Sequence, residues 1–155
     1  IQVHRADMNS YLNNKKTKKE DIKEAEELLE LKIESMYEYD AQHLNILGSN
    51  QNFAKALSQY ELIKIDKITK DSSNEEIFKA HNDIVKLFQE AIFDISNMTQ
   101  FSISKDLRIN YLADMLQDKL LSIYEHSGQL LALSSTVFKQ NNMIQEQKKV
   151  IYSLS

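Results

Sequence analysis

The chain has 155 residues, a formal net charge of −4, no Pro, no Cys and only two Gly. Sandwiches, barrels and βα units need more turns than two glycines can serve, so the composition favours an all-α fold. The lack of Cys excludes disulfides and cysteine–zinc sites. An acidic chain also lacks the basic face that binds phosphates, which argues against a nucleic-acid partner.

The chain length fits one domain. Because the chain begins with Ile1 and not with Met, we expect a fragment of a longer protein. Its apolar runs are far shorter than the roughly 20 residues that span a bilayer, so any membrane contact is expected only through flanking segments outside this chain. The composition does not indicate a compartment.

From Ala6 to Leu47 the apolar residues recur at intervals of three and four, which predicts a long first helix. Gly48 is expected to end this helix in the left-handed conformation. Ser49 or Asn50 is then expected to cap the helix that follows.

The segment Tyr11–Ile22 leaves two alternatives for the start of this helix. Thr17 and Glu20 have the spacing of a capping box, which would begin a helix there and leave residues 1–14 as a separate short helix. Against this, the apolar phase continues across the segment, and lysine stems can cover apolar surface while their charges stay in water. We favour one continuous helix.

The middle of the chain predicts two shorter helices separated by a turn. Apolar residues from Phe53 to Ile68 follow helical spacing, and 71–74 is the clearest turn in the chain. Ser73 and Glu76 fit a capping box at the start of the next helix, which extends to Met98.

A very long fourth helix is predicted after residue 103. Ser102 or Ser104 is expected to cap it, with Asp106 near its positive end. Gly128 lies inside it, but no Pro interrupts it. Its apolar stripe keeps one phase to the C-terminus, at Leu112, Leu116, Leu120, Ile123, Leu130, Val137, Ile144 and Ile151.

Together these elements predict an antiparallel up-down bundle of four helices, two long and outer, two shorter and inner. The first helix would then lie beside the last. Residues 20–133 would form the four-helix body, and residues 1–19 and 134–155 a coiled-coil-like stalk beyond it. The apolar face of the stalk predicts oligomer contacts at Met8, Leu12, Val137, Ile144 and Ile151.

Candidate metal and catalytic residues are sparse. Asp40 and His43 have the spacing of half a metal site, but a four-helix carboxylate site needs a paired Glu-x-x-His motif and further glutamates, which are missing. His81 lies on the apolar phase of the third helix, where a core histidine bonded to a neighbour is the expected role. We therefore predict no metal, no cofactor and no enzymatic activity.

Two charged surfaces stand out on the first helix. An acidic row is a candidate docking surface for a basic partner, and its members are Glu20, Glu24, Glu27, Glu34 and Glu38. The lysines at 15, 16, 18 and 19 lack interleaved aromatic residues, so solvation is their expected role.

These observations favour a non-enzymatic interaction or assembly module that binds a protein partner, a second copy or both. The alternative is an extracytoplasmic sensory domain, because the predicted architecture is similar in shape to four-helix domains of bacterial chemoreceptors and sensor kinases. Such domains often bind anions through arginines, and this chain has only Arg5 and Arg108, at opposite ends of the predicted bundle. Apolar segments of about 20 residues on both sides of the chain in its parent protein would favour the sensory reading.

Overall fold

A computed structural model describes residues 1–13, 17–69, 72–99 and 105–140; the side chains of 132, 133 and 135–140 are not described. In chain order the elements are α1 (Gln2–Leu12), α2 (Lys19–His43), the 3₁₀ turn η1 (Leu47–Ser49), α3 (Gln51–Leu62), α4 (Asn74–Met98), α5 (Leu107–Asp114), the π-helical segment η3 (Met115–Leu120) and α6 (Leu121–Gln140). These ranges contain no strand, so the predicted all-α class is confirmed for them. None of their helices is both long enough and apolar enough to cross a bilayer.

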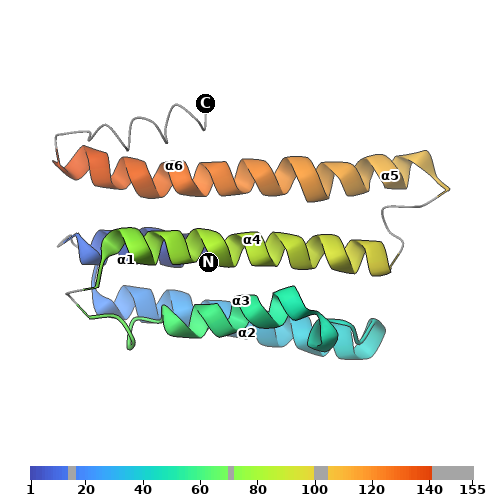
Figure 1. Cartoon of the computed structure of the whole chain (residues 1–155), viewed down its shortest axis with the longest axis horizontal. Coiled ribbons are helices and arrows are strands. Elements are labelled where there is room, and N and C mark those ends of the chain that lie inside the picture. Colours follow the sequence, from blue (N-terminus) through green and yellow to red (C-terminus); the bar gives the residue numbers. More distant parts are fainter. Residues whose placement is uncertain (14–16, 70–71, 100–104, 141–155) are drawn as a thin grey trace.

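The helices form three layers (Figure 1). α5, η3 and α6 make one continuous outer helix along one edge, α4 and α1 lie in the middle, and α2 and α3 form the other edge. α1 has 11 residues against 25 in α4, and it runs in the same direction as α6. It packs against α2, α4 and α6, so this short helix joins all three layers.

The prediction of one continuous first helix is wrong. α1 ends at Leu12, and Lys18 begins α2 with an extended backbone, φ −89° and ψ 160°. The backbone N–H of Lys18 donates to the Asp21 carboxylate at 2.8 Å, which satisfies one orphan amide of the new helix. The chain therefore does begin a helix near Thr17, as the capping pattern indicated, although Lys18 and Asp21 make the cap.

The fold-back of α1 also changes the expected role of residues 1–19. The predicted stalk would project from the body, whereas α1 is packed inside it. Met8 meets Ile22 and Ile65 in a buried cluster that neither α1 nor α2 could form alone. Burial of these three side chains is the physical reason for the chain reversal. It is α1, not α2, that lies against α6.

Three of the other helix starts are capped by side chains. Asn50 accepts from Phe53 N–H at 2.8 Å, and Ser73 accepts from Glu76 N–H at 3.3 Å, in agreement with the sequence. The last helix differs. Asp106 is its cap, accepting from Arg108 N–H at 2.9 Å, in place of the predicted Ser102 or Ser104, which lie outside the described residues.

The end of α2 also differs from the expectation. Asn45, and not Gly48, takes the left-handed conformation, with φ 51°. Asp40 is buried there and accepts from the backbone N–H groups of Ile46 and Leu47 at 3.0 and 2.9 Å. An aspartate that holds two turn amides removes the need for a glycine at the helix end.

The apolar core lies between α2, α3 and α4, with α1 closing one end. Its central cluster contains Ala56, Tyr60, Ile63 and Ile84. A second cluster, around Leu47, Phe53 and Ala91, fills the other end. Of the described residues of the outer helix, Ala113 alone is a buried hydrophobic residue. The outer helix is therefore attached to the body largely by polar contacts.

Candidate functional surfaces and the buried polar network

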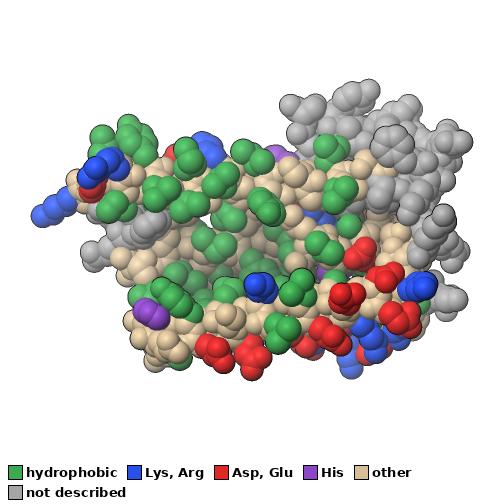
Figure 2. All heavy atoms as spheres, turned by 180° about the vertical axis from the view of Figure 1, so that it is seen from behind, with side chains coloured by type: hydrophobic (Ala, Val, Ile, Leu, Met, Phe, Trp, Pro, Cys, Tyr) green, Lys and Arg blue, Asp and Glu red, His purple; other side chains and the backbone are tan. Residues whose placement is uncertain are grey.

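The outer helix carries its large apolar side chains on the solvent side. Figure 2 shows hydrophobic side chains spread along this helix, seen from behind. Those at least 38% exposed are Leu107, Ile109, Tyr111, Leu112, Met115, Leu116, Leu120, Ile123, Tyr124, Leu130 and Leu131. Monomeric proteins rarely expose contiguous apolar surface of this extent unless it is an interaction site.

The side of the outer helix that faces the body is polar. Arg5 Nη1 donates to Glu125 Oε1 at 2.7 Å, and the Gln2 amide donates to the Tyr124 carbonyl at 2.8 Å. Further along, the Gln117 amide donates to Ser96 of α4. The orientation of this helix, apolar outward and polar inward, is the reverse of an ordinary surface helix.

Arg5 and Glu125 form a buried ion pair between α1 and α6. The Arg5 side chain is fully enclosed and also donates to Asn82 at 2.6 Å. Gly128 makes this approach possible, because a Cβ there would lie 2.8 Å from Arg5 Nη2 and 2.7 Å from Gln2 Cδ. An Arg that is enclosed and paired in this way is not open to an anionic ligand, and Arg108 is engaged with Asp106 at the surface.

Two histidines meet in the interior. His4 Nδ1 lies 2.8 Å from His81 Nε2, and His4 Nε2 lies 3.0 Å from Glu26 Oε1. His81 Nδ1 lies 2.7 Å from the Ile77 carbonyl, so it must donate there. Then His81 Nε2 accepts from His4 Nδ1–H, and a further proton, shared by His4 and Glu26, is needed for the third contact. The prediction that His81 is bonded to a neighbour is confirmed.

Burial sets the charge state of this pair. It lowers the pKa of His81 to about 3, with the neighbouring His4 adding to the effect. Burial also lowers the pKa of His4, against the opposite influence of Glu26. Glu26 additionally accepts from Ile65 N–H at 2.6 Å, so one carboxylate ties α1 to the segment after α3. We interpret this network as structural, since both rings are enclosed.

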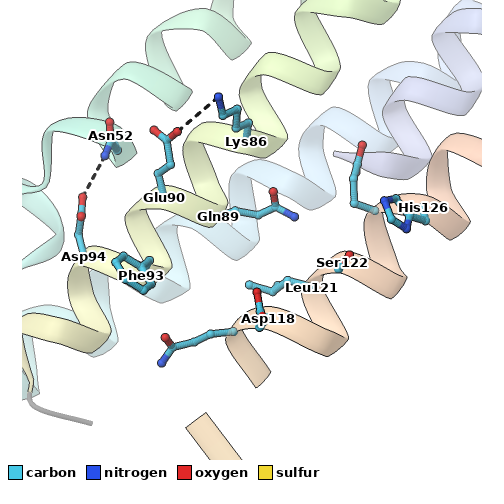
Figure 3. Close-up of a pocket in the computed structure, with 12 residues that line it drawn as sticks. Asn52, Lys86, Gln89, Glu90, Phe93, Asp94, Asp118, Leu121, Ser122 and His126 are labelled. Carbon is cyan, nitrogen blue, oxygen red and sulfur yellow. Dashed lines mark hydrogen bonds and ion pairs between the residues drawn. The ribbon is translucent and has the colours of Figure 1, made fainter. Parts of the chain in front are cut away.

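A cleft of about 590 Å³ opens between α4 and the outer helix (Figure 3). Gln89, Glu90 and Asp94 line it from α4, and Asp118, Leu121, Ser122 and His126 from η3 and α6. Asp94 accepts from Asn52 at 2.9 Å, and Lys86 lies 3.8 Å from Glu90. The cleft is thus lined by both polar and apolar side chains, and it is of a size that small molecules occupy. It also borders a π-helical segment, a feature that is frequent at functional sites.

The acidic row keeps its predicted position on the surface. Glu20, Glu24, Glu27, Glu34 and Glu38 are all exposed on α2. Figure 2 shows acidic side chains along this edge of the molecule. Their role as a docking surface stays a prediction.

The predicted oligomer contacts fall in different environments. Met8 is fully buried, and Leu12 packs on the same cluster. Val137 belongs to α6, while Ile144 and Ile151 lie outside the described residues. Asp40 and His43 do not come together as metal ligands, since Asp40 holds the turn amides and His43 stacks on Tyr39. No group of three metal-ligating side chains occurs in the described ranges.

No protein-family model, curated protein or solved structure matches this chain. Its function has to follow from its own residues and geometry.

Proposed function

We propose that this chain is a non-enzymatic helical-bundle module of interaction or assembly, which acts through protein–protein contacts. The observation that carries the proposal is the reversed outer helix, whose large apolar side chains face solvent while Gln117 and Glu125 face the body. Water disfavours such a surface, so a partner that covers it is stabilising.

The acidic row on α2 is a second contact surface in this proposal. Five exposed carboxylates along one helix attract a basic partner and set the orientation of the encounter. The two surfaces lie on opposite edges of the molecule in Figure 1, on α2 and on the outer helix. A module with two such surfaces can join two different components of an assembly.

Site-specific photo-crosslinking in the native cells tests the proposal. A photo-reactive amino acid is placed at Leu116 on the outer helix, at Glu34 on α2 and, as a control, at the exposed Lys55 of α3. We expect discrete protein adducts from Leu116 and none from Lys55. The proposal is wrong if Leu116 and Glu34 give no adduct above the Lys55 background.

The cleft of Figure 3 favours a second candidate, an extracytoplasmic sensory domain that binds a small ligand. Its volume and its position beside the π-helical segment are the supporting observations. Thermal-shift screening of small polar compounds tests this candidate. A true ligand should raise the melting temperature of the wild type and lose its effect in Gln89→Leu, while Gln59→Leu, on the surface of α3, should respond like the wild type. Without such a compound the candidate has no support.

A further inference from the structure

A groove of about 490 Å³ lies between α2 and α3, and we call it the α2–α3 groove. It belongs to the edge of the molecule opposite the outer helix (Figure 1). Its volume falls within the usual range of ligand pockets, roughly 300–1,000 Å³. Its polar and aromatic lining residues are Glu30, Glu34 and Tyr37 from α2, Tyr60 and Glu61 from α3, and Lys64 just after α3.

The α2–α3 groove carries an excess of negative charge, because three glutamates face one lysine. Lys64 Nζ lies 2.7 Å from Glu30 Oε1 and 2.5 Å from Glu61 Oε1. The same ammonium lies 5.5 Å from the centre of the Tyr60 ring. The groove thus already surrounds one cation of the chain with two carboxylates and an aromatic ring. Glu34, a member of the acidic row, is exposed and takes no part in this pairing.

Tyr60 forms the buried side of the α2–α3 groove. It is 1% exposed, and its hydroxyl has no hydrogen-bond partner among the described residues. Burial raises the pKa of this phenol, and Glu26, Glu30 and Glu61 add to the effect, so the hydroxyl lies within electrostatic reach of two carboxylates of the groove. Native proteins rarely leave a buried hydroxyl unbonded, because the missing bond costs free energy. A group in the groove that donates to this oxygen would remove the cost.

We infer that the α2–α3 groove takes an arginine side chain from a basic segment of a partner protein; this inference rests on the proposed function and names the residue that the acidic row receives. The groove offers the Glu34 carboxylate, the Tyr60 hydroxyl oxygen and the half-exposed ring of Tyr37. A guanidinium stacks on aromatic rings and donates in several directions from one plane, so it can bond to a carboxylate and a hydroxyl together. A lysine supplies only a compact, strongly hydrated point charge.

The acidic row favours a protein segment over a free small cation as the source of this arginine. Glu34 lines the groove, and the row extends from it along α2 in both directions, to Glu20 and to Glu38. A basic segment that lies along α2 meets the whole row, and these exposed charges steer its approach. A free small cation would use the groove alone and leave the rest of the row without a role.

Fluorescence anisotropy of the purified 155-residue chain with a short labelled peptide of alternating Arg and Ser tests the inference. The same peptide with Lys in place of Arg should bind more weakly. Tyr60→Phe should weaken the arginine peptide about tenfold, the effect of one hydrogen bond to a charged group. Tyr39→Phe, at an exposed ring of α2 outside the groove, should bind like the wild type. The melting temperature of Tyr60→Phe should not fall, because its hydroxyl is unbonded in the free chain.

Two matched pairs of charge variants locate the peptide. Glu34→Gln should weaken the arginine peptide about three- to tenfold, and Glu75→Gln, which removes the same charge from α4, should bind like the wild type. Lys64→Gln should tighten binding more than Lys55→Gln, because it also releases the carboxylates of Glu30 and Glu61 for the peptide. Equal effects within each pair would mean that the peptide senses only the net charge of the chain, which contradicts the inference.

Other outcomes overturn the inference and leave the proposed function standing, provided that Glu34 or Leu116 still crosslinks in cells. An arginine peptide that binds the wild type and Tyr60→Phe equally lies on the acidic row and not in the groove. A lysine peptide that binds as tightly as the arginine peptide rules out the guanidinium. Acetyl-arginine amide that binds as tightly as the peptide, with the same loss in Tyr60→Phe, makes the groove a small-molecule site.

Failure of the proposed function has a different signature. If the arginine peptide does not bind the purified chain, the inference is wrong, and the crosslinks in cells decide about the rest. Adducts from Glu34 or Leu116 then keep the interaction module, with a partner that uses another chemistry. No adduct from either position removes the inference and the proposed function together.

Discussion

At the scale of single residues, a chain of buried polar side chains connects the helices of this protein. Glu26, His4 and His81 link α2, α1 and α4 through two side-chain contacts of 2.8 and 3.0 Å. Arg5, the next residue along α1, links the same helix to Glu125 of α6. Buried polar contacts of this kind favour one arrangement, because a shift leaves a donor or an acceptor unpaired, although Arg5 Nε has no hydrogen-bond partner among the described residues.

The first prediction concerns acid stability. An unfolded histidine titrates near 6.5, while His81 in the folded chain titrates at about 3. The folded state therefore binds fewer protons between these values, and the stabilising contribution is present above pH 6.5 and lost as pH falls toward 3. A single proton gives a slope of about 1.4 kcal/mol per pH unit, or about 2 kcal/mol between pH 6.5 and 5.

Urea unfolding at pH 7, 6 and 5 measures this contribution. His81→Gln should make the decline in unfolding free energy shallower, and His43→Gln, at an exposed ring, should leave the wild-type slope. Equal slopes in all three proteins would refute the assignment of the proton to His81.

The second prediction concerns Tyr60. Its side chain is 1% exposed, and its hydroxyl has no hydrogen-bond partner among the described residues. Burial raises the pKa of this phenol, with Glu26 adding to the effect. Tyr60→Phe removes a buried unpaired hydroxyl and keeps the ring, so we expect stability equal to the wild type or about 1 kcal/mol higher in thermal unfolding. Tyr37→Phe is the half-exposed control; a loss above 1 kcal/mol at position 60 alone would show that the hydroxyl is bonded.

Part of this residue-level picture could be predicted from the sequence. His81 lies on the apolar phase of its helix. Glu26, one turn after Ile22, lies on the apolar phase too, but a charged residue is rarely buried unless it is paired. His4 is one turn before Met8 and shares its face, which was a usable signal. The pairing of His4 with His81 was not predictable, since 77 residues separate them and the fold-back of α1 brings them together.

At the scale of elements, the local sequence predicts where helices begin more reliably than which helices pack against one another. α3 and α4 appear where apolar spacing and the caps Asn50 and Ser73 place them. The break before α2 does not follow from the apolar phase, because lysines in phase are compatible with a continuous helix and the burial that Met8 gains on chain reversal is a tertiary effect. Gly128 leaves the outer helix unbroken, and its role is close packing against α1.

The third prediction tests that packing. A Cβ at position 128 would meet Gln2 and Arg5 at under 3 Å, and Arg5 is held by its ion pair. Gly128→Ala should destabilise the protein by about 1–3 kcal/mol through overpacking, despite the better helix propensity of Ala. Ser127→Ala, one residue away and exposed, should be neutral or slightly stabilising.

Addition of Gln2→Ala to Gly128→Ala should recover part of the loss in unfolding free energy, measured by urea unfolding. Stability unchanged in Gly128→Ala would mean that α1 does not approach α6 this closely.

At the scale of the whole molecule, the protein is a packed body with an outer helix attached to it. The body holds the apolar clusters, and of the described outer-helix residues only Ala113 is a buried hydrophobic residue. Apolar periodicity alone could not reveal this arrangement. The stripe of the last helix looks like a core stripe, and whether a chain buries it within itself or against a partner depends on competition for the core.

The fourth prediction is a gradient in backbone stability. Amides in the middle of α4, near His81 and Ile84, should exchange with solvent slowest, at a free energy close to that of global unfolding. Amides of α5, which buries only Ala113, should exchange through low-energy local opening. Hydrogen exchange with mass spectrometry measures both. Uniform protection across the helices would contradict this gradient.

The position of α1 has a mechanical consequence. Arg5 is bonded to the outer helix and His4 to the body, so adjacent residues of one short helix are anchored to two layers that share little apolar contact. If the outer helix were rotated or shifted, Glu125 would move with it, and Arg5 would have to follow or leave a buried charge unpaired. The displacement would then pass along α1 to the His4–His81 contact. We expect a shift at the solvent face of α6 to be felt at the centre of α4 through these two adjacent residues.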